Sequence, residues 1–270
     1  MQTDRPEIKL ITALTFFLSI SLTGVSLAWA STKEVGGTKV NVLVANDPLQ
    51  IRSAKLWMRN GPDEERCSSS IVAKNVLLTA AHCVVDWKAD HMQVRLSSKA
   101  SDKWEDGIQI NVSEIIFPKD IDQNLIRKSK QGISNKIFDI LDYALIVLED
   151  EVPAPFLPTK LSDTADPRMA KYLVVTGFGT SMSPGQSGYF HKFTADAFEA
   201  DGLGTEVYLR TQMCSGDSGG GVFEVDASGE LKLTAVNSRG GVCGPEEATW
   251  LPAQASKWIR SILEDLKNSK

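Results

Sequence analysis

The feature of this chain that most constrains its fold is a succession of short segments rich in Val, Ile and Leu, each bounded by Gly, Pro, Asn, Asp or Ser. Many short strands separated by turn residues are typical of an all-β protein, either a sandwich or a pair of barrels. We therefore expect strands at Lys39–Val44, Ser70–Leu78 with an interruption at Lys74 and Asn75, Met92–Leu96, Ile108–Ile116, Tyr143–Leu148, Tyr172–Thr176, Glu206–Arg210, Gly221–Val225 and Leu231–Val236.

The end of the sequence has a different pattern. Between Pro252 and Leu266 the apolar residues recur every three or four positions, which is the spacing of an amphipathic helix. Pro252 suits the first turn, where a backbone N–H has no partner within the helix. We expect a C-terminal α-helix over this segment.

The polar segment Lys119–Lys136 carries charges of both signs and predicts a surface insertion. Asp120, Asp122 and Asn124 alternate as the start of a calcium-binding loop would, but the required glycine does not follow. Gln131 also stands where the closing glutamate belongs. We expect a solvated loop here and no metal site.

The first thirty residues resemble an export signal. Arg5 and Lys9 precede an apolar run over residues 10–29, which ends in the small-x-small triplet Ala28-Trp29-Ala30. This pattern predicts a signal peptide over residues 1–30, with Ser31 as the mature N-terminus, and a secreted or periplasmic protein. A retained membrane anchor is the alternative, because the run is close to the length that spans a bilayer.

Length, charge and cysteine content narrow the choice further. The 270 residues could form one large domain or two small ones, and a net charge of −5 without long runs of one sign makes nucleic acid an unexpected partner. In an exported chain the four cysteines imply two disulfides, with three pairings to choose from. Cys67 with Cys83 and Cys214 with Cys243 are the short-loop pairs. Without a Cys-x-x-Cys pair we expect neither a metal nor another cofactor.

The segment with the most distinctive chemistry is Cys214-Ser215-Gly216-Asp217-Ser218-Gly219-Gly220. Glycines at this density mark a tight turn or a close approach to a ligand. Such a turn would expose the hydroxyl of Ser218 and aim the N–H groups of Gly216 and Ser218 at one point. This is the geometry of an oxyanion hole. The alternative is an ordinary surface turn.

A nucleophilic serine needs a base and an acid that orients it. Of the three histidines, His82 follows an apolar run and precedes Cys83, which would fix the backbone, whereas His91 and His191 have the settings of surface or packing residues. Asp142 adjoins a strand pattern, where a buried carboxylate needs a partner that an imidazole would supply. Asp139 is a rival for this role.

The Gly-x-Ser-x-Gly spacing also fits the nucleophile elbow of an α/β-hydrolase. In that class the order is serine, then acid, then histidine. No histidine follows Ser218 in this chain, so an α/β-hydrolase would lack its catalytic base. The order His82, Asp142, Ser218 is the other known arrangement.

Three blocks of the sequence, Thr79–Cys83, Asp142–Ile146 and Gly216–Gly220, resemble the signature motifs of the trypsin/chymotrypsin family of serine proteases. The resemblance extends over nearly all of the chain after the signal segment and suggests a secreted member of bacterial type. It implies two six-stranded antiparallel Greek-key β-barrels with a C-terminal α-helix, the active site between the barrels, and a protease domain over residues 38–270.

The same resemblance assigns roles to the residues of these blocks. His82 would be the general base and then the acid, Asp142 would orient it, and Ser218 would be the nucleophile. Gly216 and Ser218 would supply the oxyanion N–H groups. Cys67–Cys83 would frame the histidine.

Substrate specificity is predicted from positions that depart from the family pattern. Gln212 stands at the base of the pocket for the residue before the scissile bond, where an aspartate would bind Arg or Lys. Ser238 and Gly240 lie on the segment that resembles the family's substrate-binding strand. We expect a preference for an uncharged residue. Arg239 would either favour acidic residues near the cut or lie in solvent.

Activation is a separate question. In family zymogens a new apolar N-terminus folds inward and pairs with the aspartate before the nucleophile, here Asp217. Glu34-Val35-Gly36-Gly37 resembles the usual segment, with residues 31–37 as a short propeptide cut after Lys33 or Glu34. However, Glu34 is charged where an aliphatic residue belongs. Three alternatives are open: the new terminus is Val35, Asp217 finds another cation, or this resemblance is accidental.

The sequence thus predicts a secreted serine endopeptidase that forms an acyl-enzyme, with a catalytically silent binding protein on the same fold as the alternative. The expected partners are polypeptide substrates, with protein inhibitors as further candidates and no nucleic acid. We expect a monomer.

Overall fold

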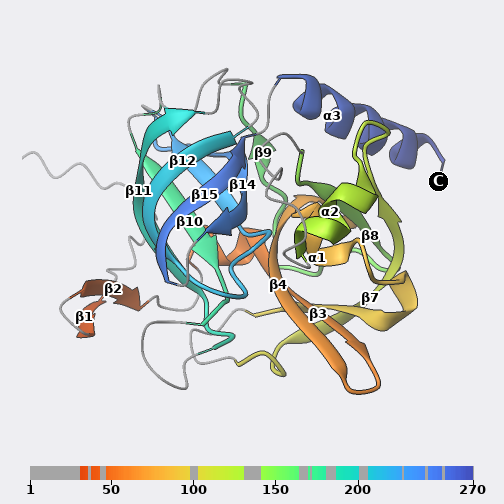
Figure 1. Cartoon of the computed structure of the whole chain (residues 1–270), viewed down its shortest axis with the longest axis horizontal. Helices are drawn as coiled ribbons and strands as arrows, with labels where there is room; N and C mark the ends of the chain where they lie inside the picture. The colour runs from red at the N-terminus through yellow and green to blue at the C-terminus, as the bar shows by residue number, and fades with distance from the viewer. Residues whose placement is uncertain are drawn as a thin grey trace, which may run out of the picture.

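A computed structural model describes residues 31–35, 38–42, 47–97, 103–130, 141–163, 170, 172–180, 187–200, 206–226, 228–240, 243–250 and 253–269. The expected signal peptide over residues 1–30, the rival acid Asp139 and the pair Gly36-Gly37 lie outside these residues. The described chain is mostly β, as predicted. Figure 1 shows two sheets side by side, with the C-terminal helix at one end of the molecule.

Six antiparallel strands form the first sheet, a closed barrel in the order β3-β4-β5-β8-β7-β6. Its core is apolar because side chains alternate: β6 places every second residue inside, and β8 is buried at all five positions. The strands are β3 (Ser53–Asn60), β4 (Asp63–Ala73), β5 (Val76–Thr79), β6 (Met92–Leu96), β7 (Ile108–Ile116) and β8 (Ala144–Leu148).

The second sheet has the order β13-β10-β11-β12-β15-β14-β9. Pairing of β13 with β14 closes all but β9 into an antiparallel ring, and β9 adds to β14 in parallel. The predicted pair of six-stranded barrels is therefore confirmed, with one short parallel strand added. The strands are β9 (Lys160–Leu161), β10 (Leu173–Gly177), β11 (His191–Ala200), β12 (Glu206–Met213), β13 (Gly221–Val225), β14 (Leu231–Gly240) and β15 (Gly244–Trp250).

The strand predictions were accurate for three strands with alternating or short apolar patterns, whereas the segment Ser70–Leu78 spans the end of β4 and most of β5. The bounds of β6, β7 and β13 agree with those predicted, whereas β3, β11 and β15 were not predicted. The missed strands contain several charged residues; in β3, for example, Lys55 is fully buried. Its ammonium donates to the carbonyls of Lys103 and Asp106. A charged residue therefore faces inward in β3, and the apolar alternation by which a strand is predicted is interrupted there.

The helices connect and cover the barrels. The predicted C-terminal helix is present as α3 (Ala253–Asn268), which buries Ala255 and Ile259 and places Trp258 against Tyr143, with ring centroids 5.7 Å apart. Shorter helices are η1 (Gln50–Arg52), α1 (Ala81–Val84) and η2 (Ala89–His91). Among the described residues, no helix is long and apolar enough to cross a bilayer.

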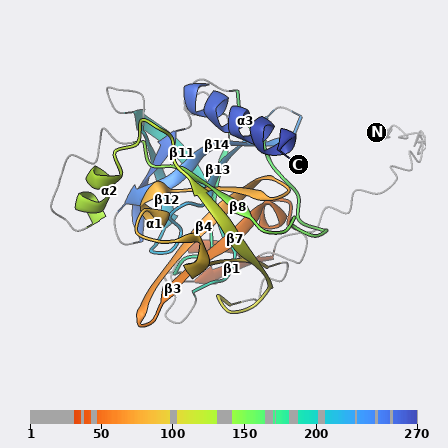
Figure 2. The ribbon, with the colours of Figure 1, turned by 90° about the vertical axis from the view of Figure 1, so that its right-hand side faces the viewer.

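Part of the predicted surface loop is in fact a helix, α2 (Gln123–Lys130), which projects from one side of the molecule in Figure 2. The alternating acidic residues that suggested a calcium loop begin this helix: the Asp122 carboxylate accepts the N–H groups of Asn124 and Leu125, both at 3.0 Å. Ile126 is buried and anchors the helix. The helix was missed because a single apolar anchor gives no periodicity.

Before the first barrel, β1 (Ser31–Val35) pairs antiparallel with β2 (Thr38–Val42), and Val35 lies opposite Thr38.

Candidate active site

His82 lies on the short helix α1, directly after β5 of the first barrel. Strand β5 is buried at all four positions, so its end is held firmly. The disulfide between Cys67 on β4 and Cys83 on α1 fixes the backbone beside the imidazole. The second disulfide joins Cys214 to Cys243, and so both short-loop pairings are present.

The buried carboxylate of Asp142 holds this histidine by two contacts. His82 Nδ1 lies 2.6 Å from Asp142 Oδ2, and the backbone N–H of His82 donates to Asp142 Oδ1 at 2.8 Å. The Ser238 hydroxyl, from β14 of the second barrel, also donates to Oδ2 at 2.6 Å. The contacts of Asp142 thus span both barrels.

The electrostatics of Asp142 follow from these contacts. Burial by itself raises the pKa of the Asp142 carboxyl, because it disfavours the charged form. The charge of His82, its hydrogen bonds and the Ser238 hydroxyl outweigh burial and hold the pKa of this carboxyl below its ordinary value. Asp142 is therefore an anion throughout the neutral range.

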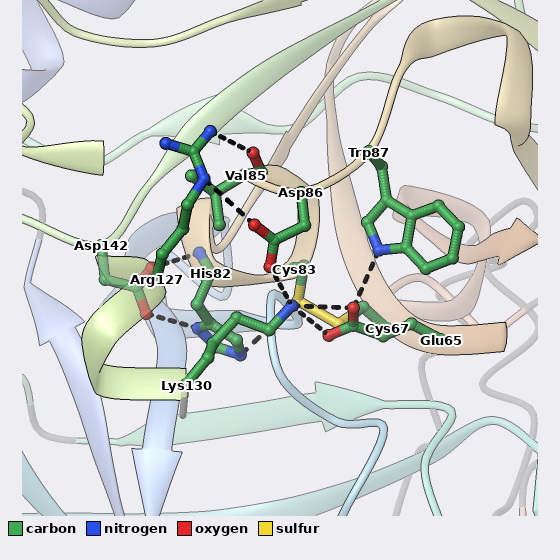
Figure 3. A network of polar contacts seen from close by, with 10 residues as sticks. All are labelled: Glu65, Cys67, His82, Cys83, Val85, Asp86, Trp87, Arg127, Lys130 and Asp142. Carbon is green, nitrogen blue, oxygen red and sulfur yellow. Dashed lines mark hydrogen bonds and ion pairs between the residues drawn. A yellow bond between two sulfur atoms is a disulfide. The ribbon is translucent and has the colours of Figure 1, made fainter. Parts of the chain in front are cut away.

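A network of charged side chains attaches α2 to the region around His82 (Figure 3). Lys130 on α2 contacts Glu65 at 2.8 Å and Asp86 at 3.4 Å, and Arg127 bonds Asp86 at 3.1 Å. Trp87 donates its indole N–H to Glu65 at 2.8 Å. These contacts connect α2, β4 and the segment after α1. The described part of the predicted insertion, residues 119–130, is therefore held against β4 and the segment after α1 and is not a loop in free solvent.

Ser218 lies on the glycine-rich turn between β12 and β13 of the second barrel. Gly216 and Gly219 adopt φ values of 93° and 82°, which only glycine adopts readily. Strand β4 of the first barrel clamps this turn: Ser68 donates its N–H to the Ser218 carbonyl at 2.8 Å and its hydroxyl to the Gly216 carbonyl at 2.9 Å. Within the part of the chain that the structure describes, the N–H groups of Gly216 and Ser218 donate to no protein acceptor.

Ser238 lies at the meeting point of the two halves. Its hydroxyl bonds Asp142, and its carbonyl accepts the Ser218 hydroxyl at 3.5 Å. His82 and Ser218, both within the described residues, are not hydrogen bonded to each other in this arrangement. The bond from Ser238 to Asp142 was not predicted, since no feature of the sequence relates residues so far apart.

Asp217 is buried inside the turn and accepts three hydrogen bonds. Oδ1 accepts the N–H of Gly179 at 2.6 Å and Oδ2 accepts the N–H of Cys214 at 2.8 Å. A side chain at Gly179 would collide with this carboxylate, which explains the glycine. The third partner is His191 Nε2, 2.7 Å from Oδ1.

The prediction that His191 is a surface or packing residue is correct in that the residue is buried, but it missed the carboxylate partner. The imidazole is buried and paired with a carboxylate. No motif around His191 indicates this pairing with Asp217. By contrast His91 is half-buried on η2 and lies 3.9 Å from Asp90, which agrees with a surface position.

The residues predicted to bind substrate lie on strands of the second barrel. Gln212 is on β12 and Gly240 ends β14, with β15 paired between these two strands. Arg239 is half-buried and its guanidinium donates to the Ser238 hydroxyl at 3.2 Å, so it does not simply lie in solvent.

One cluster near the site has the residue types of a metal centre. The potential ligand atoms of Cys67, His82 and Cys83 lie within 4.8 Å of one another. Both sulfurs are joined in the disulfide, however, and metal binding requires the thiolate. This cluster therefore offers an ion only the imidazole.

Comparison with known protein families gives a match over most of the chain. The model of the family described as trypsin matches residues 45–259. This span includes both barrels from β3 to β15 and ends within α3. A search of curated proteins found no match.

Proposed function

The chain belongs to the trypsin family, and on this premise we propose that it is a secreted serine endopeptidase that cleaves peptide bonds through an acyl-enzyme intermediate. The observation that carries this proposal is the contact between the two halves of the site. The first barrel supplies a buried Asp142–His82 pair, the second supplies Ser218 on a turn whose N–H groups at Gly216 and Ser218 have no acceptor among the described residues, and Ser238 bonds both.

In the first chemical step the Ser218 hydroxyl attacks the scissile carbonyl. Rotation about its Cα–Cβ bond redirects the hydroxyl from the Ser238 carbonyl to His82 Nε2, which accepts the proton. Asp142 accepts the N–H at Nδ1, which keeps Nε2 free as the base and stabilises the imidazolium once it forms. The low pKa of Asp142 supports this role because the carboxylate stays charged.

The carbonyl oxygen becomes an anion in the same step. The N–H groups of Gly216 and Ser218, which have no acceptor in the described part of the chain, would donate to it, and such preorganised donors are a large source of rate enhancement. His82 then returns the proton to the leaving amine. Water attacks the acyl-enzyme with His82 again as base, which restores Ser218.

We further propose that the substrate residue before the cut is uncharged, since Gln212 offers a neutral amide where a carboxylate would be needed to pair with Arg or Lys. A peptide-library profile of the purified protein tests this. Cleavage mainly after Arg or Lys would contradict it.

Export and processing are also proposals. A signal peptide over residues 1–30 and a site outside the cytoplasm agree with the two disulfides, which form in oxidising compartments. Sequencing the N-terminus of the protein recovered from an exporting host tests the cleavage after Ala30. A chain that keeps Met1 in the membrane fraction would support an anchor instead.

The decisive experiment for the activity is covalent labelling with a fluorophosphonate, which reacts only with an activated serine. We expect one label at Ser218, located by peptide mass spectrometry. It should be absent in Ser218→Ala and reduced at least 1000-fold in rate in His82→Ala. A folded protein that takes no label would favour a catalytically silent binding protein.

A further inference from the structure

We propose that His191 is the permanent partner of Asp217, so that the oxyanion turn is assembled in the uncut chain without a new N-terminus from residues 34–37. His191 would be a positioning residue that acts on Ser218 through Asp217. This inference rests on the proposed protease function, since it concerns how the same site is switched on.

The pair itself is buried and close. His191 Nε2 lies 2.7 Å from Asp217 Oδ1, while His191 is 5% exposed and Asp217 only 1%. A buried carboxylate is costly unless it is paired and hydrogen bonded. Two backbone N–H groups already bond it, and the imidazole completes the set. The site therefore needs no ammonium group from elsewhere.

The Asp217 carboxylate controls the turn that carries Ser218. Besides the side-chain bond to the Cys214 N–H, the N–H of Asp217 donates to the Cys214 carbonyl at 3.0 Å, and its carbonyl accepts the Gly220 N–H at 2.9 Å. Residues 214–220 therefore wrap around this one residue. Releasing the carboxylate would free the backbone whose N–H groups at Gly216 and Ser218 form the proposed oxyanion hole.

The imidazole is held rigidly by the second barrel. His191 opens β11, and its backbone pairs with Gly177 of β10. The ring of Phe193 lies 5.3 Å from the imidazole, centroid to centroid. The neighbouring cation Lys192 is engaged elsewhere, with Asp47 at 2.6 Å. Strand β11 thus delivers the imidazole, and not the lysine, to Asp217.

The uncut chain already contains this pairing. In the structure Ser31–Val35 is still a strand of the two-stranded sheet with Thr38–Val42, and Asp217 has its partner at the same time. The pairing also accounts for Glu34, a charged residue where an inserted terminus would need an aliphatic one. If no terminus is ever inserted, that position has no reason to be apolar.

The test compares labelling of Ser218 by a fluorophosphonate in the exported protein before and after treatment with trypsin. The variants are Lys33→Gln/Glu34→Gln, which removes both candidate cleavage sites, His191→Phe and His191→Gln, with His91→Gln as the matched control on the surface. Intact mass identifies the N-terminus of each sample. Circular dichroism reports whether each variant folds.

We expect the uncut wild type and Lys33→Gln/Glu34→Gln to label at the same rate, and trypsin to add nothing. His191→Phe should lower the labelling rate about 100-fold, the cost of losing an oxyanion donor. On a peptide substrate, kcat should fall while KM changes little. His191→Gln keeps a donor near the Nε2 position and should recover about tenfold, and His91→Gln should match the wild type. If His191→Phe does not fold, the test depends on His191→Gln, whose labelling rate should be roughly tenfold below that of the wild type.

Other outcomes separate the two proposals. A wild type that labels only after cleavage, or a His191→Phe variant that labels as fast as the wild type or faster, would overturn the role of His191 and leave the protease function standing. A folded wild type that labels in neither state would overturn both.

Discussion

The two halves of the site are held in place by different kinds of contact. On the base side, the partners are far apart in the sequence: His82 bonds Asp142, 60 residues away, and Asp142 bonds Ser238, 96 residues away in the other barrel. On the side of the proposed nucleophile, long-range contacts such as those from Ser68 are joined by hydrogen bonds within the turn itself, as between Asp217 and Cys214 three residues earlier. The proposed base is thus positioned chiefly by long-range contacts, whereas the proposed nucleophile also depends on a local turn around one buried carboxylate.

The largest effect should come from the base side. In Asp142→Asn the amide stabilises the wrong tautomer of His82, and kcat on a peptide amide should fall about 10⁴-fold with the fold intact. Steady-state kinetics with circular dichroism measure this.

The rival acid serves as the control for this experiment. Asp139→Asn should keep wild-type kcat. Equal losses in the two variants, or a loss below tenfold in Asp142→Asn, would remove Asp142 from the proposed triad.

The disulfides give a direct contrast between the halves. The crosslinked residues are 16 positions apart in Cys67–Cys83 and 29 apart in Cys214–Cys243, so the chain-entropy model gives similar losses of about 3 and about 4 kcal/mol when each pair is replaced by alanine. Denaturant unfolding measures these losses.

The effects of the two disulfides on kcat should differ more than their effects on stability. Cys214 belongs to the turn and its N–H holds Asp217, so Cys214→Ala/Cys243→Ala should lower kcat further than Cys67→Ala/Cys83→Ala in the folded fraction. If kcat fell further in Cys67→Ala/Cys83→Ala, the local disulfide constraint would matter more for His82 than for the turn of Ser218, and our comparison would be wrong.

Low pH should remove the stabilising contribution of the Asp142 carboxylate to the folded protein. The native pKa of Asp142 lies below the ordinary value of 3.8, so the stabilising contribution of this carboxylate is complete above that value and is lost as the pH falls towards the native pKa. In that window the unfolded chain binds one more proton, and the free energy of unfolding falls by about 1.4 kcal/mol per pH unit from this group. Asp142→Asn should lack this part of the slope. Parallel curves for the two proteins between pH 4 and 2 would contradict the prediction.

The smallest effect should come from the charged network beside α2. Lys130→Gln removes the contacts to Glu65 and Asp86, but these side chains are partly exposed, and such pairs contribute less than about 1 kcal/mol. Hydrogen exchange in α2 should become faster while kcat stays unchanged. A tenfold change in kcat would place α2 in the active site.

The difference between local and long-range contacts also explains which parts of the molecule could be predicted from the sequence. The turn around Ser218 was identified from the sequence because glycine, aspartate and serine are adjacent there, and strands β6, β7 and β13 were found with accurate bounds. The Ser238–Asp142 and His191–Asp217 bonds were not found, because each joins residues that only the folded barrels bring together. Helix α2 was not predicted either, because it is anchored by one buried isoleucine and an aspartate cap, which produce no periodic apolar pattern.

The contact between Trp258 and Tyr143 has a consequence for biosynthesis. Tyr143 is the residue next to Asp142, and it is covered by a helix that follows every described strand in the chain. Until α3 has been synthesised, Tyr143 lacks this ring contact. The packing around the residue next to Asp142 is therefore complete only once α3 has been made and has docked.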